Sequence, residues 1–357
     1  MPWRGGPSPE VLRHAVDQPA LSREDQASAS QNRTKTVHLR PEGGWCLNPS
    51  RFLVHGEETG LGCEPIPSMN KNNAAPQSPK AERLHHMSWR PDSAVRGVVV
   101  LVHGLAEHCG RYGHVVEALL AQGVAVHALD LPGHGRSGGA RLAVHRFSEF
   151  TDAVAWLHRR VRREYPEAPV FLLGHSMGGL IVARHAIDQP QGIQGLILSA
   201  PALQISPSIG PWQRCLTRRL AKWAPSLGLP GLELSGISRD VAVMRAYAQD
   251  PWVHHGRTPA GLAGCLLGAI EGVVPDLPRL QLPFLVLQGG GDRLVHSEGA
   301  RLLMRQAGSR DKQLRWYEGL YHEVFNEPER AQVIGDVLDW LGPRLLAEPA
   351  AADSPSR

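Results

Sequence analysis

Ser176 has the residue type and the surroundings that nucleophilic catalysis requires. It is the central residue of the motif G-H-S-M-G at 174–178, which directly follows the apolar run 170–173 and precedes an apolar helical pattern. A nucleophile elbow has this strand–turn–helix context. Glycines two residues before and after the serine leave room for a sharp, strained turn that lifts the hydroxyl above the strand. We therefore predict that Ser176 is a nucleophile; a plain glycine-rich turn is the alternative.

A serine hydroxyl is a weak nucleophile until a base accepts its proton, and two later residues follow in the required order of acid, then histidine. Asp292 ends the run PFLVLQGGGD at 283–292, and His322 comes shortly after the run QLRWYEG at 313–319. Taken alone, each has a structural alternative: Asp292 is a turn carboxylate, or His322 is a histidine of a surface loop. Together with Ser176, at successive strand ends, they predict His322 as general base and acid, with Asp292 orienting and stabilising its ring.

Acyl transfer also needs N–H donors for the tetrahedral oxyanion. We predict the backbone N–H of Met177, directly after the nucleophile, and that of Leu105 in the loop HGLA at 103–106. Glu107 and Arg111 lie one helical turn apart, so they either pair to brace this loop or form a solvated ion pair. Asp130 ends another strand but precedes the nucleophile, so we expect it to brace a loop.

The elements that must position these residues alternate along the chain. The β-branched and apolar runs predict buried strands, and amphipathic patterns between them predict helices. Strands are expected at 97–104, 124–130, 169–176, 195–201, 283–292 and 313–319, with a short edge strand within 83–90. Helices are expected at 112–122, 148–163, 177–188 and 298–307, with a last one from near 326–328 to 346. Ser148 is the expected N-cap of the second helix, and Pro328 is expected in the first turn of the last.

This alternation predicts an α/β fold with a mostly parallel sheet covered on both faces. It is broken once, by a long stretch without a buried-strand run. The predicted organisation is therefore a core at 76–202 and 273–346, with a helical cap inserted at 203–272. The stretch 1–75 is rich in Pro, Ser, Gln, Asn and Gly without apolar periodicity, so we expect a disordered leader; 347–357 is expected to be a disordered tail.

Bulk properties exclude several classes of function. The formal charge of +4 is small and spread along the chain, which gives no indication of nucleic-acid binding. No paired cysteine or histidine spacing indicates a metal site, and nothing calls for an organic cofactor. The cysteines are odd in number and irregularly spaced, which argues against a disulfide framework. No apolar run reaches about 18 residues, the length of a membrane-spanning helix, and the N-terminus lacks the apolar region of a secretory signal. We therefore expect a cytoplasmic protein.

Several of these segments resemble a known family. LVHGLAEHCGRY (101–112), ALDLPGHGRSGG (128–139), VFLLGHSMGGLIVAR (170–184), VLQGGGDRLV (286–295) and YEGLYHEVFNEPER (317–330) are similar to monoacylglycerol lipases and lysophospholipase-like serine hydrolases of bacterial type. The resemblance covers about 80–345. It implies the α/β-hydrolase fold, the same triad and oxyanion positions, and a mobile helical cap over an apolar acyl tunnel. The oxyanion loop departs from the family in carrying the bulkier Leu105.

The predicted function is hydrolysis of carboxylic esters with medium or long acyl chains, of monoacylglycerol or lysophospholipid type, without a metal or cofactor. A serine aminopeptidase or an acyltransferase using the same triad is the alternative, because the fold does not separate them. A non-catalytic binding protein is a third reading, which retention of all three triad residues disfavours.

The predicted cap contains an amphipathic basic stretch. Trp212, Leu216, Leu220 and Trp223 recur at helical spacing among Arg214, Arg218, Arg219 and Lys222. Such a helix either lies on an anionic membrane surface as a peripheral contact or packs its apolar stripe onto the core. The sequence favours packing.

Overall fold

The computed structural model describes residues 84–230 and 234–346. All of them belong to one compact unit, Asn48–Arg357. The predicted leader at 1–75 and tail at 347–357 lie outside the described residues.

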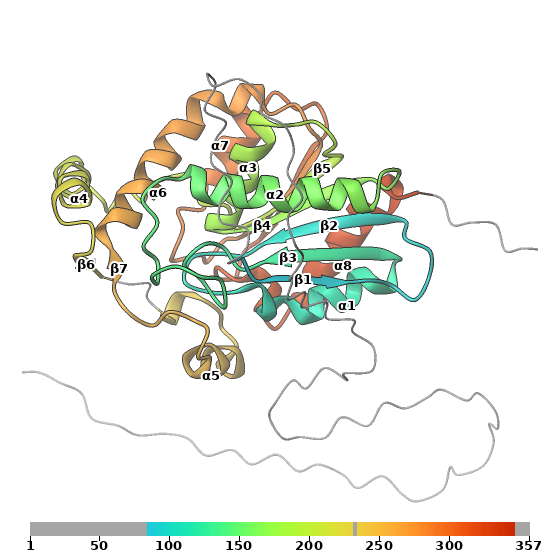
Figure 1. Ribbon diagram of the computed structural model, residues 1–357, viewed down its shortest axis with the longest axis horizontal. Coiled ribbons are helices and arrows are strands. Elements are labelled where there is room, and N and C mark those ends of the chain that lie inside the picture. Colours follow the sequence, from blue (N-terminus) through green and yellow to red (C-terminus); the bar gives the residue numbers. More distant parts are fainter. Residues whose placement is uncertain (1–83, 231–233, 347–357) are drawn as a thin grey trace, which may run out of the picture. The chain divides into compact units, whose positions relative to one another are not determined.

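A mostly parallel sheet forms the centre of this unit (Figure 1). Its strands are β1 (His86–Trp89), β2 (Gly97–Val102), β3 (Val124–Leu129), β4 (Val170–His175), β5 (Gly195–Ser199), β8 (Phe284–Gly289) and β9 (Lys312–Tyr317). They lie in the order β1-β3-β2-β4-β5-β8-β9. β1 pairs antiparallel with β3, and every other neighbouring pair in this sheet is parallel. The predicted α/β fold with a mostly parallel sheet is confirmed.

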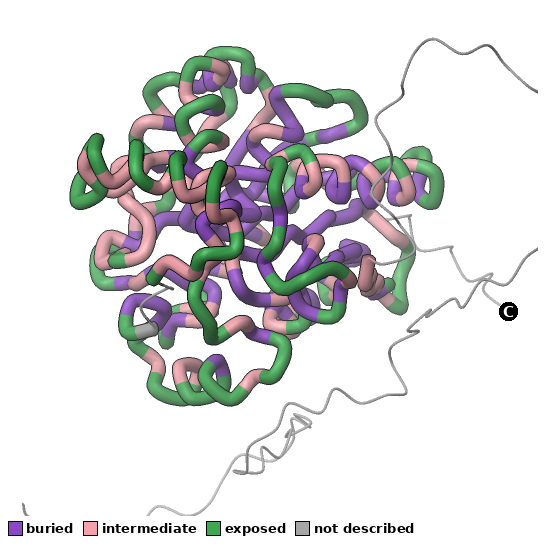
Figure 2. Tube along the Cα trace, turned by 60° about the vertical axis from the view of Figure 1, so that its left-hand side comes forward, coloured by how far each residue is buried: buried purple, intermediate pink, exposed green. Residues whose placement is uncertain are grey.

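The continuous apolar runs arise because both faces of the sheet are covered. In β2, Val98, Val100 and Val102 join one buried cluster, together with side chains of α2 (Ser148–Glu164), α3 (Met177–Asp188), α6 (Ala260–Val273) and α7 (Glu298–Gln306). Val99 and Leu101 point to the other face and join a second cluster with side chains of α1 (Gly113–Ala121) and α8 (Arg330–Leu341). All five are completely buried. Figure 2 shows the buried positions gathered in the interior of the described chain, with the exposed ones around them.

The helices that cover the sheet begin and end close to the predicted bounds, except the last one, which begins later than predicted and ends at Leu341 instead of 346. They are α1 (Gly113–Ala121), α2 (Ser148–Glu164), α3 (Met177–Asp188), α7 (Glu298–Gln306) and α8 (Arg330–Leu341). Ser148 is not an N-cap: it is the first residue of α2, and Glu149 instead accepts hydrogen bonds from the backbone N–H groups of His145 and Arg146, at 3.3 and 3.1 Å.

The last helix begins later than predicted. Residues Val324–Asn326 form a short 3₁₀ turn (η6), and α8 starts only at Arg330. Glu327 is extended, with φ −80° and ψ 160°, as expected for a residue before proline. Its buried carboxylate binds Arg239 instead of capping the helix. Pro328 therefore precedes the helix by two residues.

Between β5 and β8 the chain leaves the sheet. This insertion contains α4 (Pro211–Trp223), β6 (Gly228–Leu229), a 3₁₀ turn η4 (Leu234–Gly236), α5 (Val241–Gln249), β7 (Thr258–Pro259), α6 (Ala260–Val273) and η5 (Val274–Arg279). β6 and β7 pair antiparallel. In Figure 1, α4 and α5 stand beside the sheet and α6 leads back to it. The predicted boundary between cap and core, at residues 272 and 273, falls inside the last turn of α6. Leu262 and Val273 of this helix are buried in the same cluster as side chains of α3.

One helical segment among the described residues, Ala260–Arg279, is long and apolar enough to cross a membrane by length and composition alone. Core helices of soluble proteins meet the same criterion. Here the segment packs against α4 and α3 and contributes Leu262, Val273 and Leu277 to the core.

Candidate active site

Ser176 occupies a strained turn between β4 and α3. Its backbone has φ 55° and ψ −116°, a conformation that side chains rarely adopt and that is found preferentially at functional sites. The neighbouring glycines are sterically required. A Cβ on Gly178 would lie 2.2 Å from the carbonyl oxygen of Val102, and one on Gly174 would lie 2.4 Å from that of Gly178. The turn therefore has the geometry of the predicted nucleophile elbow.

Asp292 and His322 are paired. The Nδ1 atom of His322 lies 2.8 Å from Oδ2 of Asp292, whose other oxygen accepts from the backbone N–H groups of Leu294 and Val295 at 2.9 and 3.0 Å. An ionised carboxylate accepts only, so Nδ1 carries the proton and donates it. This leaves Nε2 of His322 as the free basic nitrogen, the tautomer that a general base needs.

Charge and burial tune this pair. Burial alone lowers the pKa of His322, but the charge and hydrogen bond of Asp292, with further contributions from Glu323 and Glu107, raise it above the ordinary 6.5. Burial raises the pKa of Asp292, whereas His322 and two backbone N–H groups lower it, and the net shift is downward. The aspartate is therefore ionised across the neutral range and stabilises a protonated imidazole.

The structure brings these loops to the elbow. His175, which directly precedes Ser176, has its ring centroid 4.8 Å from that of His322. On the other side, a Cβ on Gly104 would lie 3.4 Å from Cβ of Ser176. Among the described residues, no hydrogen bond joins the Ser176 hydroxyl to His322. Catalytic hydrogen bonds are often long without substrate and shorten in the reactive complex.

The two proposed oxyanion donors belong to different segments, one after β2 and one after β4. Met177 is the first residue of α3, where the backbone N–H groups and the helix dipole favour negative charge. Leu105 follows Gly104, and Ala106 after it has φ 67°. The side chain of Leu105 packs against the larger core cluster. The roles of both N–H groups stay predictions.

Glu107 and Arg111 brace the loop that carries Leu105. Glu107 is almost completely buried and accepts from the backbone N–H of Gly104 at 2.6 Å and from the hydroxyl of Tyr112 at 2.7 Å. Arg111 donates to its other oxygen at 2.7 Å. The solvated alternative for this pair is wrong. Asp130 braces a loop as predicted, accepting from the backbone N–H of Cys109 at 2.9 Å.

Sequence reasoning missed Glu323. Both of its oxygens accept from Arg111, at 2.6 and 2.7 Å, and Asn326 donates to one of them at 2.8 Å. The only available signal was its place directly after His322. Its partner lies 212 residues earlier in the chain, and no local pattern indicates such a contact.

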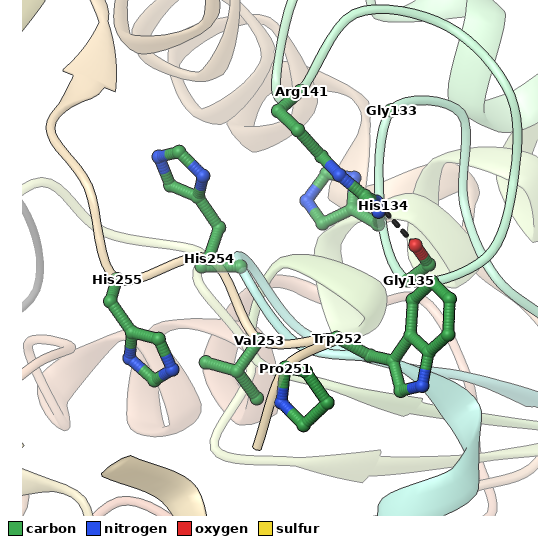
Figure 3. Close-up of a pocket in the computed structure, with 10 residues that line it drawn as sticks. Gly133, His134, Gly135, Arg141, Pro251, Trp252, Val253, His254 and His255 are labelled. Carbon is green, nitrogen blue, oxygen red and sulfur yellow. Dashed lines mark hydrogen bonds between the residues drawn. The ribbon is translucent and has the colours of Figure 1, made fainter. Parts of the chain in front are cut away.

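A polar cavity of about 180 Å³ lies beside the oxyanion loop (Figure 3). It is formed by the loop after β3 and the segment after α5, where the N–H of His254 donates to the carbonyl oxygen of Ala106 at 2.8 Å. Figure 3 shows His254 and His255 pointing to opposite sides of that segment. Ser176 is not among the lining residues. Within residues 84–230 and 234–346, no group of three or more His, Cys, Asp or Glu side chains could hold a metal ion.

Comparisons with known proteins agree with this architecture. Residues 93–329 match the family described as "Serine aminopeptidase, S33". The chain is 42% identical over 259 residues to a monoacylglycerol lipase of Mycolicibacterium smegmatis, which covers 72% of this chain and 92% of that relative. It is 36% identical over 250 residues to phospholipase YtpA of Bacillus subtilis, covering 69% of this chain and 95% of the relative. Among solved structures, the monoacylglycerol lipase of Paleococcus ferrophilus superimposes with a TM-score of 0.66 at 33% identity, covering 72% of this chain and 98% of that one.

Proposed function

The chain belongs to the serine aminopeptidase S33 family of α/β-hydrolases, and we propose that within it the protein hydrolyses carboxylic esters of lipids, with Ser176 as the nucleophile. The strained turn at Ser176 beside a paired Asp292 and His322 carries this proposal. The choice of a lipid ester as substrate is supported by similarity to monoacylglycerol lipases and to a phospholipase.

The reaction proceeds in two halves. Nε2 of His322 accepts the hydroxyl proton of Ser176 as its oxygen attacks the ester carbonyl. The oxyanion is stabilised by the N–H groups of Leu105 and Met177. Protonated His322 then gives the proton to the leaving alcohol, and an acyl-enzyme remains. A water molecule, deprotonated by His322, then attacks the acyl-enzyme. The protonated imidazole returns the proton to the oxygen of Ser176 as the fatty acid is released.

An ester series tests this proposal. We expect purified protein to cleave p-nitrophenyl esters and monoacylglycerols with an optimum at medium or long acyl chains, and Ser176→Ala to lose the activity by at least about 10⁴-fold. Hydrolysis that survives in the variant would remove the nucleophile assignment.

The peptidase alternative has a distinct signature. The family description names an aminopeptidase, whereas the relatives of highest identity described above carry lipase or phospholipase names. Rapid cleavage of aminoacyl p-nitroanilides beside negligible cleavage of every ester would support the peptidase. An acyltransferase would instead consume the ester faster when an acceptor alcohol is added.

We also propose that α4 makes a peripheral membrane contact. The packing alternative is wrong for three side chains of its apolar stripe, because Trp212, Leu216 and Trp223 are 69, 46 and 78% exposed. Another side of α4 faces α6, where Arg218 pairs with Glu271. Exposed tryptophans among basic residues suit an anionic lipid surface, where a lipid ester is also found.

Sedimentation with vesicles tests this contact. We expect the protein to bind vesicles of anionic lipid and Arg219→Glu/Lys222→Glu to bind less, since each basic residue near such a surface contributes about 1 kcal/mol. Arg163→Glu/Arg310→Glu, which reverses two charges at exposed positions outside the insertion, is the matched control. Equal partition of both variants and the wild type would contradict the proposal.

A further inference from the structure

Two loops that come from distant parts of the chain must stand at a set separation for acyl transfer. The oxyanion loop carries Leu105, and the loop after β9 carries His322. One tetrahedral intermediate, bonded to Ser176, has to meet the donors of the first loop and the imidazole of the second at the same time. Something must therefore hold the loops relative to each other as well as individually.

A buried cluster of three charged side chains joins them. The guanidinium of Arg111 donates to Glu107, which binds the backbone N–H of Gly104 in the oxyanion loop. The same guanidinium makes a two-pronged contact with Glu323, the residue after His322. The three side chains are only 9, 3 and 7% exposed for Arg111, Glu107 and Glu323. A buried ion pair often adds no more stability than apolar residues of similar size. We therefore look for the role of this cluster in the positions of the two loops that it connects.

The insertion also contacts this cluster and both loops. The ring of Tyr247 in α5 lies under the guanidinium of Arg111, 4.6 Å from its Cζ atom. His108 of the oxyanion loop pairs with Asp250 at 2.8 Å. On the other loop, the N–H of Glu323 donates to the carbonyl oxygen of Ile237 at 2.9 Å. Arg111 thus contacts Glu107 beside the oxyanion loop, Glu323 in the histidine loop and Tyr247 in α5.

We propose that Arg111 is a positioning residue that, through Glu107 and Glu323, holds the oxyanion donors and the imidazole of His322 at the separation required by the tetrahedral intermediate. This inference rests on the proposed function only for the identity of the reacting groups. It concerns how the oxyanion donors and the imidazole are held relative to each other, and it applies to any acyl or phosphonyl electrophile.

The cluster also sets the charge around His322. The titratable and charged groups that face the imidazole from the surrounding elements are Asp292 after β8, His175 at the end of β4, Glu107 and Arg111 below the oxyanion loop, and Glu323 beside it. Glu323 and Glu107 both raise the pKa of His322. Burial raises the pKa of Glu107, whereas Arg111, followed by His175, His103 and the hydroxyl of Tyr112, lowers it to about 2, so the carboxylate is ionised.

The rate at which a fluorophosphonate modifies Ser176, measured against pH, tests the inference. This reaction uses the nucleophile, the base and the oxyanion donors but does not depend on which ester is the natural substrate. We expect Arg111→Met to react about tenfold to a hundredfold more slowly at the pH optimum, because a displacement of about 1 Å costs that much. Arg111→Lys, which keeps the charge but not the two-pronged contact, should show a similar loss in rate with the wild-type pH midpoint.

Charge variants provide the readout that a purely structural role would not move. Glu323→Gln removes a charge that raises the pKa of His322, so the acid limb of its pH profile should move to lower pH. In Arg111→Met the buried Glu107 loses the cation that keeps it ionised, and with it the charge that raises the pKa of His322, so the acid limb of this variant should also move to lower pH. Arg184→Met is the matched control: Arg184 also lies between two carboxylates, Asp188 and Asp276, but on α3 away from the site.

The outcomes separate the two proposals. Wild-type rate and pH midpoint in Arg111→Met and Glu323→Gln would overturn the positioning role. A loss in rate no larger than that of Arg184→Met, with an unshifted midpoint, would overturn it equally. If the wild-type protein reacts with the probe but cleaves no lipid ester, the proposed substrate is wrong while the effect of Arg111 is still measured.

Discussion

At the scale of single residues, space around the elbow is the tightest constraint on the sequence. Gly178 faces the backbone of β2 so closely that an added Cβ would overlap the carbonyl oxygen of Val102. We expect Gly178→Ala to lower the free energy of unfolding by about 1–3 kcal/mol or more and to disturb Ser176 with it.

Gly268→Ala is the control for that change. Gly268 lies inside α6 with nothing within 4 Å of an added Cβ. A helical Gly-to-Ala exchange without a clash stabilises by up to about 1 kcal/mol. Urea denaturation of both variants compares the two sites, and similar midpoints would contradict the steric account of the elbow.

The ionisation of His322 predicts a pH profile for the wild-type enzyme. The imidazole acts as a base only when neutral, and its pKa is raised above 6.5, chiefly by Asp292 against the opposing effect of burial. The rate kcat/KM should therefore fall as the pH decreases through a midpoint above 6.5. An acid limb centred well below this value would contradict the pairing.

Asp292→Asn isolates the contribution of the carboxylate. The substitution keeps the size of the side chain but removes its charge and replaces one of the two acceptor oxygens by an NH2 donor, so the tautomer of His322 is no longer selected. We expect kcat to fall by about 10⁴-fold. A loss of less than tenfold in an ester assay would show that Asp292 is not the partner on which His322 depends.

The residue scale is also where sequence reasoning succeeded and failed most clearly. The strained turn at Ser176 and the pairing of Asp292 with His322 were predictable from residue type, from the glycines beside Ser176 and Asp292, and from their places after strands. Their catalytic roles stay predictions. Glu323 was not predictable, because its role depends on a contact with Arg111 that no spacing in the chain reveals. The burial of Glu107 was likewise invisible, since an ion pair one helical turn apart has the same sequence pattern whether it is buried or solvated.

At the scale of elements, ion pairs of Arg239 and Asp240 connect the insertion to the segment that leads into the last helix. Glu327, whose side chain is completely buried, accepts from the backbone N–H and from Nε of Arg239, at 2.9 and 2.6 Å. Arg239→Met leaves a buried carboxylate without its cation. We expect a loss of about 3 kcal/mol in the free energy of unfolding.

Arg279→Met is the comparison for this variant. Arg279 is mostly exposed and lies 3.3 Å from Asp276, so its loss should cost less than about 1 kcal/mol. Equal destabilisation of the two variants, measured by urea denaturation, would mean that the Arg239 pair does not fasten the insertion.

Element bounds followed from sequence patterns only where packing decides them. The runs buried on both faces predicted five of the longer strands well, and the more amphipathic run at 313–319 predicted β9. The helix α3 was predicted to the residue, because the apolar stretch ends where burial ends. Helix starts were less predictable. At α2 and α8 the deciding interactions are a glutamate that binds backbone N–H groups upstream and a proline that keeps the preceding residue extended.

At the scale of the whole molecule, buried histidines predict sensitivity to acid. Burial is the largest cause that lowers the pKa of His86 and His134 to about 3 and of His127, His175 and His185 to about 4. In the unfolded chain these groups take up protons near the ordinary 6.5. Below that pH the unfolded state binds more protons, so the free energy of unfolding falls as the pH decreases from about 6.5 towards 4. His322, with its raised pKa, is a single group acting in the opposite direction.

Urea denaturation at a series of pH values measures this effect. We expect the midpoint to decrease steadily between pH 7 and about 4.5, well above the range in which paired carboxylates such as Glu107 are protonated. A midpoint that is constant down to about pH 5 would contradict the neutral, buried state of these histidines.

The arrangement of the whole sheet lay beyond sequence reasoning. Alternating strands and helices predict a parallel sheet, but the order β1-β3-β2-β4-β5-β8-β9 depends on which strands meet in space. The insertion shows the same limit. Its position in the chain was visible as a gap between strands. The contacts of Tyr247 with Arg111 and of Asp250 with His108 are tertiary and have no local sequence pattern.

The central claim is that Ser176 is made nucleophilic by the groups gathered around it. Intact-protein mass spectrometry after treatment with a fluorophosphonate, followed by peptide mapping, tests this most directly. The account predicts one adduct per chain, located on Ser176, absent from Ser176→Ala and formed far more slowly in His322→Ala. An adduct on another residue, or undiminished labelling of Ser176→Ala, would contradict it.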